Sequence, residues 1–188
     1  MYNKNNFSYN RNMDNSFSQV FIDTSALLHT RAFEELIKNH LINLLYKSRA
    51  RLTIPQIVIK ELEKFVNDNS SGKAYPAKRA IENIRALNVA GYIHIDYHNG
   101  RNYVCADKYF LEEALNSHSR KEQVLLITQD YNLFRDLTAI GKMSSVGNAN
   151  CYINVKKINV QTDVVVSRTD PFTKNYKDAE KLWKNSAN

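Results

Sequence analysis

Short apolar runs that alternate with longer stretches of helical periodicity are the feature that most restricts the fold of this chain. The runs are only three to five residues long, and apolar residues recur every three or four positions in the stretches between them. Strands are predicted at 20–22, 52–54, 92–95 and 124–128, and helices at 32–48, 55–66, 75–88, 103–117 and 132–140, the last closed by Gly141. Because strands and helices alternate, we expect an α/β fold, a three-layer sandwich whose central sheet is mainly parallel and flanked by helices.

The length of 188 residues suits one domain with attached segments rather than two ordinary domains. Residues 1–18 contain six Asn and little apolar periodicity, which predicts a flexible leader outside the core. Beyond Gly147 the pattern changes to extra strands at 151–155 and 160–166 and then to a polar tail. We therefore expect a leader (1–18), one folded domain (19–150) and a C-terminal extension (151–188).

Missing motifs narrow the class of protein. No apolar run approaches the roughly 20 residues that a membrane span requires, and the polar, Asn-rich start is unlike a signal peptide. We therefore expect a soluble, cytoplasmic protein with no membrane partner. Cys105 and Cys151 have no Cys-x-x-Cys partner and no His at zinc-ligand spacing, so they are expected to be small buried residues. Without a Walker-type phosphate loop or a Gly-x-Ser-x-Gly elbow, ATP-driven chemistry and serine-dependent acyl transfer are disfavoured.

The charge of the chain is basic and unevenly distributed. Lys and Arg number 26 against 19 for Asp and Glu, which gives a net charge of +7 and a pI near 9.3. Residues 47–79 hold eight basic and three acidic residues, a local surplus of five. Such a basic surface favours polyanionic partners, nucleic acid among them, although Lys-rich faces also serve simply to keep proteins soluble.

Two aspartates stand where predicted strands end. Asp23 directly follows the run 20–22, and Asp130 follows the run 124–128 with one residue between. In open α/β sheets ligands bind outside the carboxyl ends of the strands, so both aspartates are candidates for a site. The alternative is that each serves only as the N-cap of the helix that follows.

Two further acids lie on the apolar stripes of predicted helices. Glu61 lies four residues before Phe65, and Asp107 lies three residues after Val104, so both are expected to face inward. A carboxylate buried alone is costly, and it must shift its pKa or find a partner. One bound cation would satisfy several acids at once; separate salt bridges to nearby Lys or Arg are the alternative.

Together the four carboxylates form a ligand set for a hard divalent cation. Mg²⁺ and Mn²⁺ take oxygen ligands, and each needs only one or two protein carboxylates when substrate phosphates complete the shell. Such ions activate and orient a water for attack on phosphorus and stabilise the leaving oxygen, which is the chemistry of phosphodiester hydrolysis. The lack of Cys and His clusters argues against zinc.

Several motifs carry a family resemblance. In chain order they are Phe21 to His29 (FIDTSALLH), Ile54 to Lys64 with Glu61, Ala77 to Ala80 (AKRA), Asp107 with Ala114, and Val124 to Asp130 with Leu133. Over residues 19–150 the chain resembles the PIN domain family, small nucleases built on a few acids around divalent metal. Within that family it is most similar to the PIN module of PhoH-type proteins.

The resemblance implies a metal-dependent endonuclease that acts most often on single-stranded or structured RNA. The metal, Mg²⁺ or Mn²⁺, would be held by Asp23, Glu61, Asp107 and Asp130, with support from Thr128 and Ser25. Phosphates of the nucleic acid would be held by Lys73, Lys78, Arg79, Arg85 and Arg135. The chain departs from the family at Ser25, where Asn is more usual, and at Arg135, one residue later than a common basic position.

Three functions remain open at this point. An endoribonuclease is the first, and a nuclease of DNA flaps or single strands needs the same metal cleft and basic approach. A non-catalytic PIN scaffold that binds RNA or protein is the third; it predicts a degraded acid set, whereas all four positions here are acidic. Homodimers and small inhibitory protein partners are common in the family, so the resemblance is compatible with a homo-oligomer and with such a partner.

Overall fold

A sheet of five parallel strands with one antiparallel strand at its edge forms the centre of the fold. The computed structural model describes residues 17–143, apart from 69, 99, 100 and 102, together with 152–158 and 165–167. Within this part of the chain the strand order is β3-β2-β1-β4-β5-β6, and only the β5–β6 pair is antiparallel. The strands are β1 (Gln19–Ile22), β2 (Leu52–Pro55), β3 (Ile93–Asp96), β4 (Val124–Ile127), β5 (Ile153–Ile158) and β6 (Val165–Ser167).

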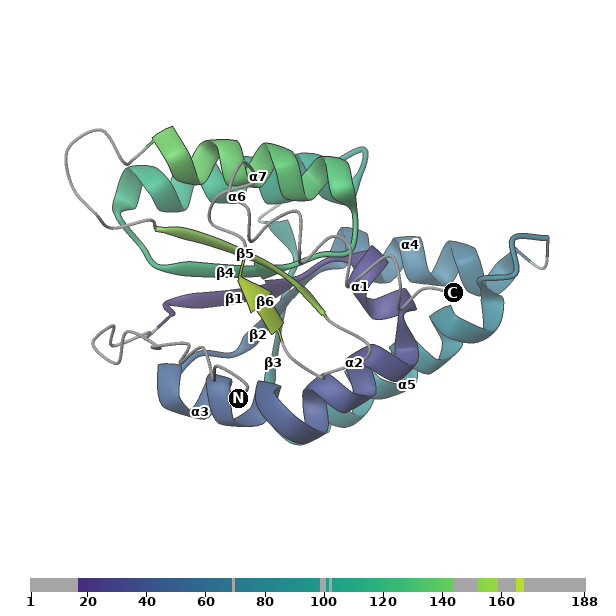
Figure 1. Cartoon of the computed structure of the whole chain (residues 1–188). Coiled ribbons are helices and arrows are strands. Elements are labelled where there is room, and N and C mark those ends of the chain that lie inside the picture. The colour runs from purple at the N-terminus through teal and green to yellow at the C-terminus, as the bar shows by residue number, and fades with distance from the viewer. Residues whose placement is uncertain are drawn as a thin grey trace, which may run out of the picture.

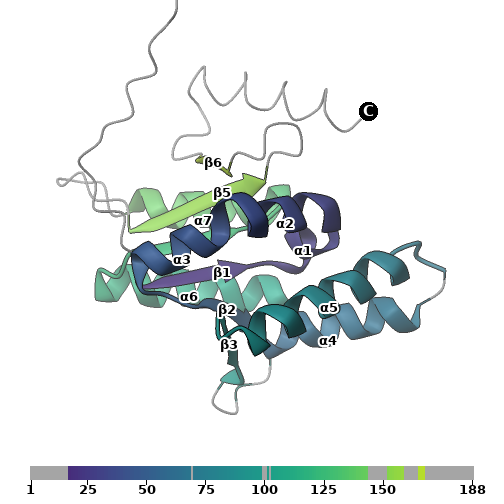
Figure 2. The ribbon, with the colours of Figure 1, turned by 90° about the horizontal axis from the view of Figure 1, so that it is seen from below.

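Helices cover both faces of this sheet, which confirms the predicted three-layer α/β sandwich (Figures 1 and 2). One face carries α6 (Ala106–Arg120) and α7 (Tyr131–Met143). The other carries α2 (Thr30–Leu36), the π-helical turn η1 (Ile37–Leu41), α3 (Ile42–Ser48) and α5 (Ala74–Val89). The short α1 (Thr24–Leu28) follows β1 directly, and α4 (Gln56–Asn67) packs along α5 as a helical hairpin.

The two central strands are buried along almost their whole length. Val20, Phe21 and Ile22 are at most 1% exposed, and every residue of β4 is buried, because a parallel sheet covered on both faces has no solvent side. The register pairs Ile22 with Ile127, so β1 and β4 end at the same level. The residues that follow these strands therefore meet at the carboxyl edge of the sheet.

Among the helix boundaries that differ from the sequence prediction, two have a clear physical cause. α6 begins at Ala106 rather than near residue 103, because Cys105 has extended backbone and the Glu61 carboxylate accepts the Ala106 amide proton from another part of the chain. α7 continues through Gly141 to Met143. Gly141 is buried in the fold, and the packing of this helix outweighs the low helix propensity of glycine.

Several predictions concern segments outside the described residues. Most of the expected leader (1–18), Cys151 and most of the polar tail fall there, and the domain limits stay predictions. Of the predicted extension, β5 and β6 are described, and β5 is the fifth parallel strand of the sheet. No helix in the described part of the chain has the length and apolar character needed to cross a membrane.

Candidate active site

Asp23 is buried at the end of β1, where it accepts hydrogen bonds from two hydroxyls. Its Oδ2 accepts from Thr128 Oγ1 at 2.9 Å, from Ser25 Oγ, and from the Ser25 backbone amide at 3.2 Å. Burial raises the pKa of this carboxyl, and the hydrogen bonds from Ser25 and Thr128 oppose the rise without cancelling it. Asp23 also stands at the N-cap of α1, so its capping role, expected as an alternative, is present in the structure.

Ser25 connects the end of β1 to the end of β4. Its Oγ accepts from the backbone amides of Gln129 at 2.9 Å and Asp130 at 3.0 Å, while donating its own proton to Asp23. The Asp130 amide is shared with Thr128 Oγ1 at 3.0 Å. The Ser25 hydroxyl therefore fixes the position of the Asp130 backbone relative to the Asp23 carboxylate.

Asp130 caps the helix that follows it. Its Oδ1 accepts from the Leu133 backbone amide at 2.8 Å, the usual contact of an N-cap aspartate with the first turn of a helix. The carboxylate is partly buried, so its oxygens are not fully enclosed by protein. The second capping role expected as an alternative is therefore also present.

Glu61 joins the site from α4 and links two other helices. Its Oε2 accepts from Thr24 Oγ1 at 2.6 Å, and its Oε1 accepts from the Ala106 backbone amide at 3.0 Å. The second bond places the Glu61 carboxylate at the N-terminus of α6, where the free amides and the helix dipole favour negative charge. The next residue along α6 is Asp107, so Glu61 brings the start of that helix to the site.

Asp107 completes the group of four acids. Partial burial raises the pKa of the Asp107 carboxyl above its ordinary value. The negative charges of Asp23, Asp130 and Glu61 raise this pKa further, which requires all three to lie near it. Asp107 makes no hydrogen bond or ion pair with any described residue, so its two oxygens have no protein donor there.

Two expectations about this region were wrong. Asp107 does not lie on a buried apolar stripe: its side chain is largely exposed, because α6 begins after Val104, and Val104 is itself 86% exposed. Cys105 is exposed rather than buried, since it lies at the N-cap of α6 on the same outward turn.

The fold of this chain is found again in known proteins. The family model for the PIN domain matches residues 20–136, a stretch that contains all four acids. The chain belongs to the PIN domain family. Its fold is similar to the solved structure of the PIN domain endonuclease Utp24, with a TM-score of 0.52 and 16% sequence identity over 81% of this chain and 92% of that one. None of the curated proteins searched matches the chain. Family membership supports a nuclease-type role in general terms.

PIN domains generally depend on a divalent metal ion, and the donor chemistry of this PIN domain fits one. All four acids are hard oxygen donors of the kind that Mg²⁺ and Mn²⁺ prefer, and their mutual charge is the kind that a cation neutralises. Within the described residues, no three His, Cys, Asp or Glu side chains are arranged close enough together to coordinate a metal ion as they stand. The oxygens of Asp23, Glu61 and Asp130 are engaged by hydroxyl and amide donors instead.

Two of the five predicted phosphate-binding residues are paired with acids. Arg79 donates to Glu34 at 2.7 Å and to Glu82 at 3.2 Å, so its guanidinium joins α5 to α2. Arg135 donates to the neighbouring Asp136 at 2.9 Å. Both side chains remain partly exposed, at 41% and 59%, but part of their donor capacity is already used.

The other three basic candidates lie on or just before α5. Lys73 places its ammonium 4.6 Å from the centre of the Phe65 ring, a contact between α4 and the start of α5. Lys78 and Arg85 are exposed and form no ion pair within the described residues. These two are therefore the members of the predicted set with the most donors left for a phosphate.

Thr24 is the site residue that sequence reasoning missed. It is not among the candidates drawn from the sequence, whereas its hydroxyl donates to Glu61. Its position directly after Asp23 was the available signal, since the residue that follows a strand-end acid lies at the same edge of the sheet.

Proposed function

We propose that this PIN domain is a metal-dependent endoribonuclease that hydrolyses phosphodiester bonds in single-stranded or structured RNA. The observation that carries the proposal is the set of hydrogen bonds that brings the four acids to one edge of the sheet: Ser25 joins Asp23 to the Asp130 backbone, and Glu61 accepts from the amide of Ala106, the residue before Asp107. The negative charges of the other three acids also raise the pKa of the Asp107 carboxyl, although the chain separates the four by up to 107 residues, from position 23 to position 130. Such repulsion in a folded protein is compensated when a cation binds.

The ion would be Mg²⁺ or Mn²⁺, held by the carboxylates of Asp23, Glu61, Asp107 and Asp130. When bound, it supplies an activated water and stabilises the charge that develops on the phosphate oxygens. Donors on the protein keep the carboxylates in place: the hydroxyls of Ser25 and Thr128 orient Asp23, and the Leu133 amide orients Asp130. Thr24 and the Ala106 amide orient Glu61 in the same way.

RNA is the favoured substrate because the family resemblance implies RNA. The basic charge of the chain suits a polyanion in general. The net charge is +7, and exposed basic side chains lie along the helix α5. Lys78 and Arg85 contribute point charges for phosphates rather than base-specific contacts, so they support binding along a strand without selecting its sequence.

The test is cleavage of end-labelled RNA and of DNA of the same sequence, each with Mn²⁺, Mg²⁺ or EDTA. Asp23→Asn and Asp130→Asn keep the shape of the side chain and remove one negative ligand, so both should abolish cleavage while the protein still unfolds cooperatively. Asp68→Asn is the matched control, because Asp68 is an exposed aspartate on the loop between α4 and α5.

Each other result has a definite meaning. Full cleavage by both site variants would refute the four-carboxylate mechanism. Cleavage of DNA in preference to RNA would make the chain a flap or single-strand DNA nuclease. Metal-independent binding of RNA by the parent protein, with no cleavage under any ion, would identify it as a non-catalytic scaffold.

A further inference from the structure

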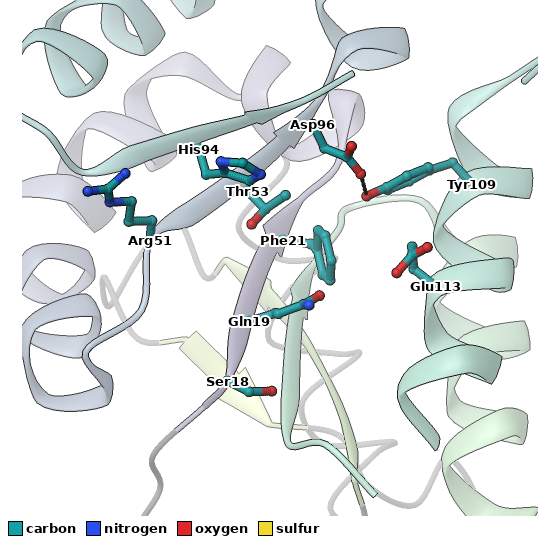
Figure 3. Close-up of a pocket in the computed structure, with 9 residues that line it drawn as sticks. All are labelled: Ser18, Gln19, Phe21, Arg51, Thr53, His94, Asp96, Tyr109 and Glu113. Atoms are coloured by element: carbon teal, nitrogen blue, oxygen red, sulfur yellow. Dashed lines mark hydrogen bonds between the residues drawn. The ribbon is translucent and has the colours of Figure 1, made fainter. Parts of the chain in front are cut away.

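A hydrogen-bond network outside the four acids joins three elements that surround them. The backbone amide of Ile57 in α4 donates to His98 Nε2 at 3.2 Å. The His98 amide donates to Asp96 Oδ1 at 2.8 Å. The Tyr109 hydroxyl donates to Asp96 Oδ2 at 2.6 Å (Figure 3). The network runs from the first turn of α4, through the end of β3, to the first turn of α6.

His98 takes the place of a missing helix cap. The N-cap of α4 is Pro55, whose side chain carries no hydrogen-bond acceptor, so the first amides of this helix have no local partner. The His98 imidazole supplies one from a loop 41 residues away in sequence. Because Nε2 accepts an N–H proton, it carries a lone pair, and the ring proton must lie on Nδ1.

The two ends of the network lie next to the helical acids. Ile57 precedes Glu61 by four residues, one turn of α4, and Tyr109 follows Asp107 by two residues in α6. Partial burial raises the pKa of Asp96, but the hydrogen bonds from Tyr109 and the His98 amide, followed by the charges of the two nearby histidines, lower it, and the pKa lies below its ordinary value. Asp96 therefore stays ionised and keeps both donors.

We propose that His98 is a positioning residue of this active site, whose neutral imidazole fixes the start of α4 and, with Asp96 and Tyr109, holds Glu61 and Asp107 ready for the metal ion. The inference rests on the proposed function, since it concerns the same metal site. It adds a dependence on pH that does not arise from the four acids. Protonation of His98 puts a proton on Nε2, facing the Ile57 amide proton, and removes the cap.

The surroundings of His98 favour its neutral form. Its side chain is 6% exposed and packs against the rings of Tyr103 and Tyr109, with centroids at 5.2 and 4.9 Å. Burial lowers the pKa of His98, and the nearby charge of Lys60 lowers it further, while Asp96 and Glu113 act in the opposite direction. His98 Nδ1 lies 3.9 Å from Asp96 Oδ2, beyond hydrogen-bond distance, so the cation gains no direct bond there.

The network also meets solvent. Asp96 and Tyr109 line a cavity of about 290 Å³ beside β1, β2 and β3, together with the exposed His94 (Figure 3). His94 lies on the same strand as Asp96 and is a second histidine of ordinary exposure. It provides a control for the loss of an imidazole ring near Asp96.

The experiment compares two substitutions in the full chain. His98→Gln keeps an acceptor that does not titrate, and His98→Phe fills the ring site without an acceptor. Both substituted residues must adopt the left-handed backbone conformation of His98, at φ 63°. The cost of that conformation is therefore shared by the two variants and does not account for a difference between them. His94→Gln is the matched control. Mn²⁺ affinity is measured by calorimetry from about pH 7.5 to about pH 5.5, the range in which histidine ordinarily titrates.

We expect His98→Phe to bind Mn²⁺ about 10-fold more weakly than the parent at the upper pH, the usual scale for losing a partner behind a metal ligand. His98→Gln should bind as the parent does there, and lose less affinity than the parent on acidification. Carboxylate protonation affects all variants alike, so the difference between curves isolates His98. In the metal-free parent, ¹⁵N shifts should show the proton on Nδ1, and exchange of the Ile57 amide should accelerate in His98→Phe.

The outcomes separate the two proposals. A folded His98→Phe protein with the affinity and pH profile of the parent would overturn the positioning role alone, as would a proton found on Nε2 at neutral pH. A parent protein that binds no Mn²⁺ would overturn the proposed function and this role together.

Discussion

Replacing Ser25 by alanine tests the site at its most connected hydroxyl. The change removes the Oγ that donates to Asp23 and that accepts from the amides of Gln129 and Asp130. The Asp130 amide keeps Thr128 Oγ1 as an acceptor at 3.0 Å, whereas no second acceptor of the Gln129 amide lies within the described part of the chain. Gln129 is 7% exposed, so this amide is left without a partner in a largely dry place.

The magnitude follows from these contacts. A buried amide left unpaired costs about 1 to 3 kcal/mol, and a lost hydrogen bond to a charged oxygen costs about as much. Asp23 keeps the Ser25 backbone amide and Thr128, so part of the second loss is recovered. We expect the free energy of unfolding to fall by about 3 kcal/mol, which lowers Tm by about 6 to 12 °C in a domain of this size.

Thermal unfolding of the metal-free protein measures this, and the chain supplies a matched control. Ser70 makes the same local contacts with Asp68 as Ser25 makes with Asp23, from both its amide and its hydroxyl, but on an exposed loop. Ser70→Ala should therefore leave Tm almost unchanged. If Ser25→Ala lowers Tm no more than Ser70→Ala does, the hydroxyl does not organise the site and the reasoning fails.

Three further outcomes are expected. In EDTA, Asp107→Asn should raise Tm because it removes a carboxyl whose pKa is raised in the folded state; the gain should shrink as pH falls from neutral, since the folded parent takes up that proton before the unfolded chain does. An equal gain at every pH would contradict the shared charge. Arg79→Gln should weaken RNA binding less than Lys78→Gln in a filter-binding titration, because the Arg79 guanidinium already pairs with two glutamates. Thr24→Val should weaken Mn²⁺ binding by calorimetry, since Glu61 loses a donor at 2.6 Å, and unchanged affinity would show that Glu61 is held without it.

The sequence predicts those parts of the fold that local pattern decides. The runs that became β1, β2 and β4 are short, apolar and buried on both sides, so their periodicity has few other interpretations. The sequence also places Asp23 and Asp130 at strand ends, whereas the neighbouring positions of β1 and β4, which bring the two aspartates together, are seen only in the structure. The start of α6 does not follow from the sequence, since its first amide is capped by Glu61, 45 residues earlier in the chain.

Contacts between distant loops are the part that no local pattern reveals. His98 follows a strand and carries no motif, and its role as an acceptor for α4 exists only because β2 and β3 are adjacent and end together, with Pro55 opposite Asp96. The sequence alone does not distinguish His98 from the exposed His94. The predicted burial of Asp107 was wrong for a related reason. The start of α6 decides which residues belong to the helix, and therefore which of them share its buried face.

The capping and metal-binding explanations of the acids, set out as alternatives from the sequence, are compatible in the folded chain. Asp23, Glu61 and Asp130 each accept a hydrogen bond from an amide near a helix N-terminus. These hydrogen bonds stabilise the negative charges of the carboxylates when no ion is bound. Asp107 has no such bond within the described residues, and the repulsion from the other three acts on it. Three carboxylates are therefore parts of the fold as well as of the site, whereas the fourth is held only by its helix. Removing any of the first three carboxylates should lower both the stability of the fold and the affinity for metal. Removing the Asp107 carboxylate should lower the affinity for metal without lowering stability.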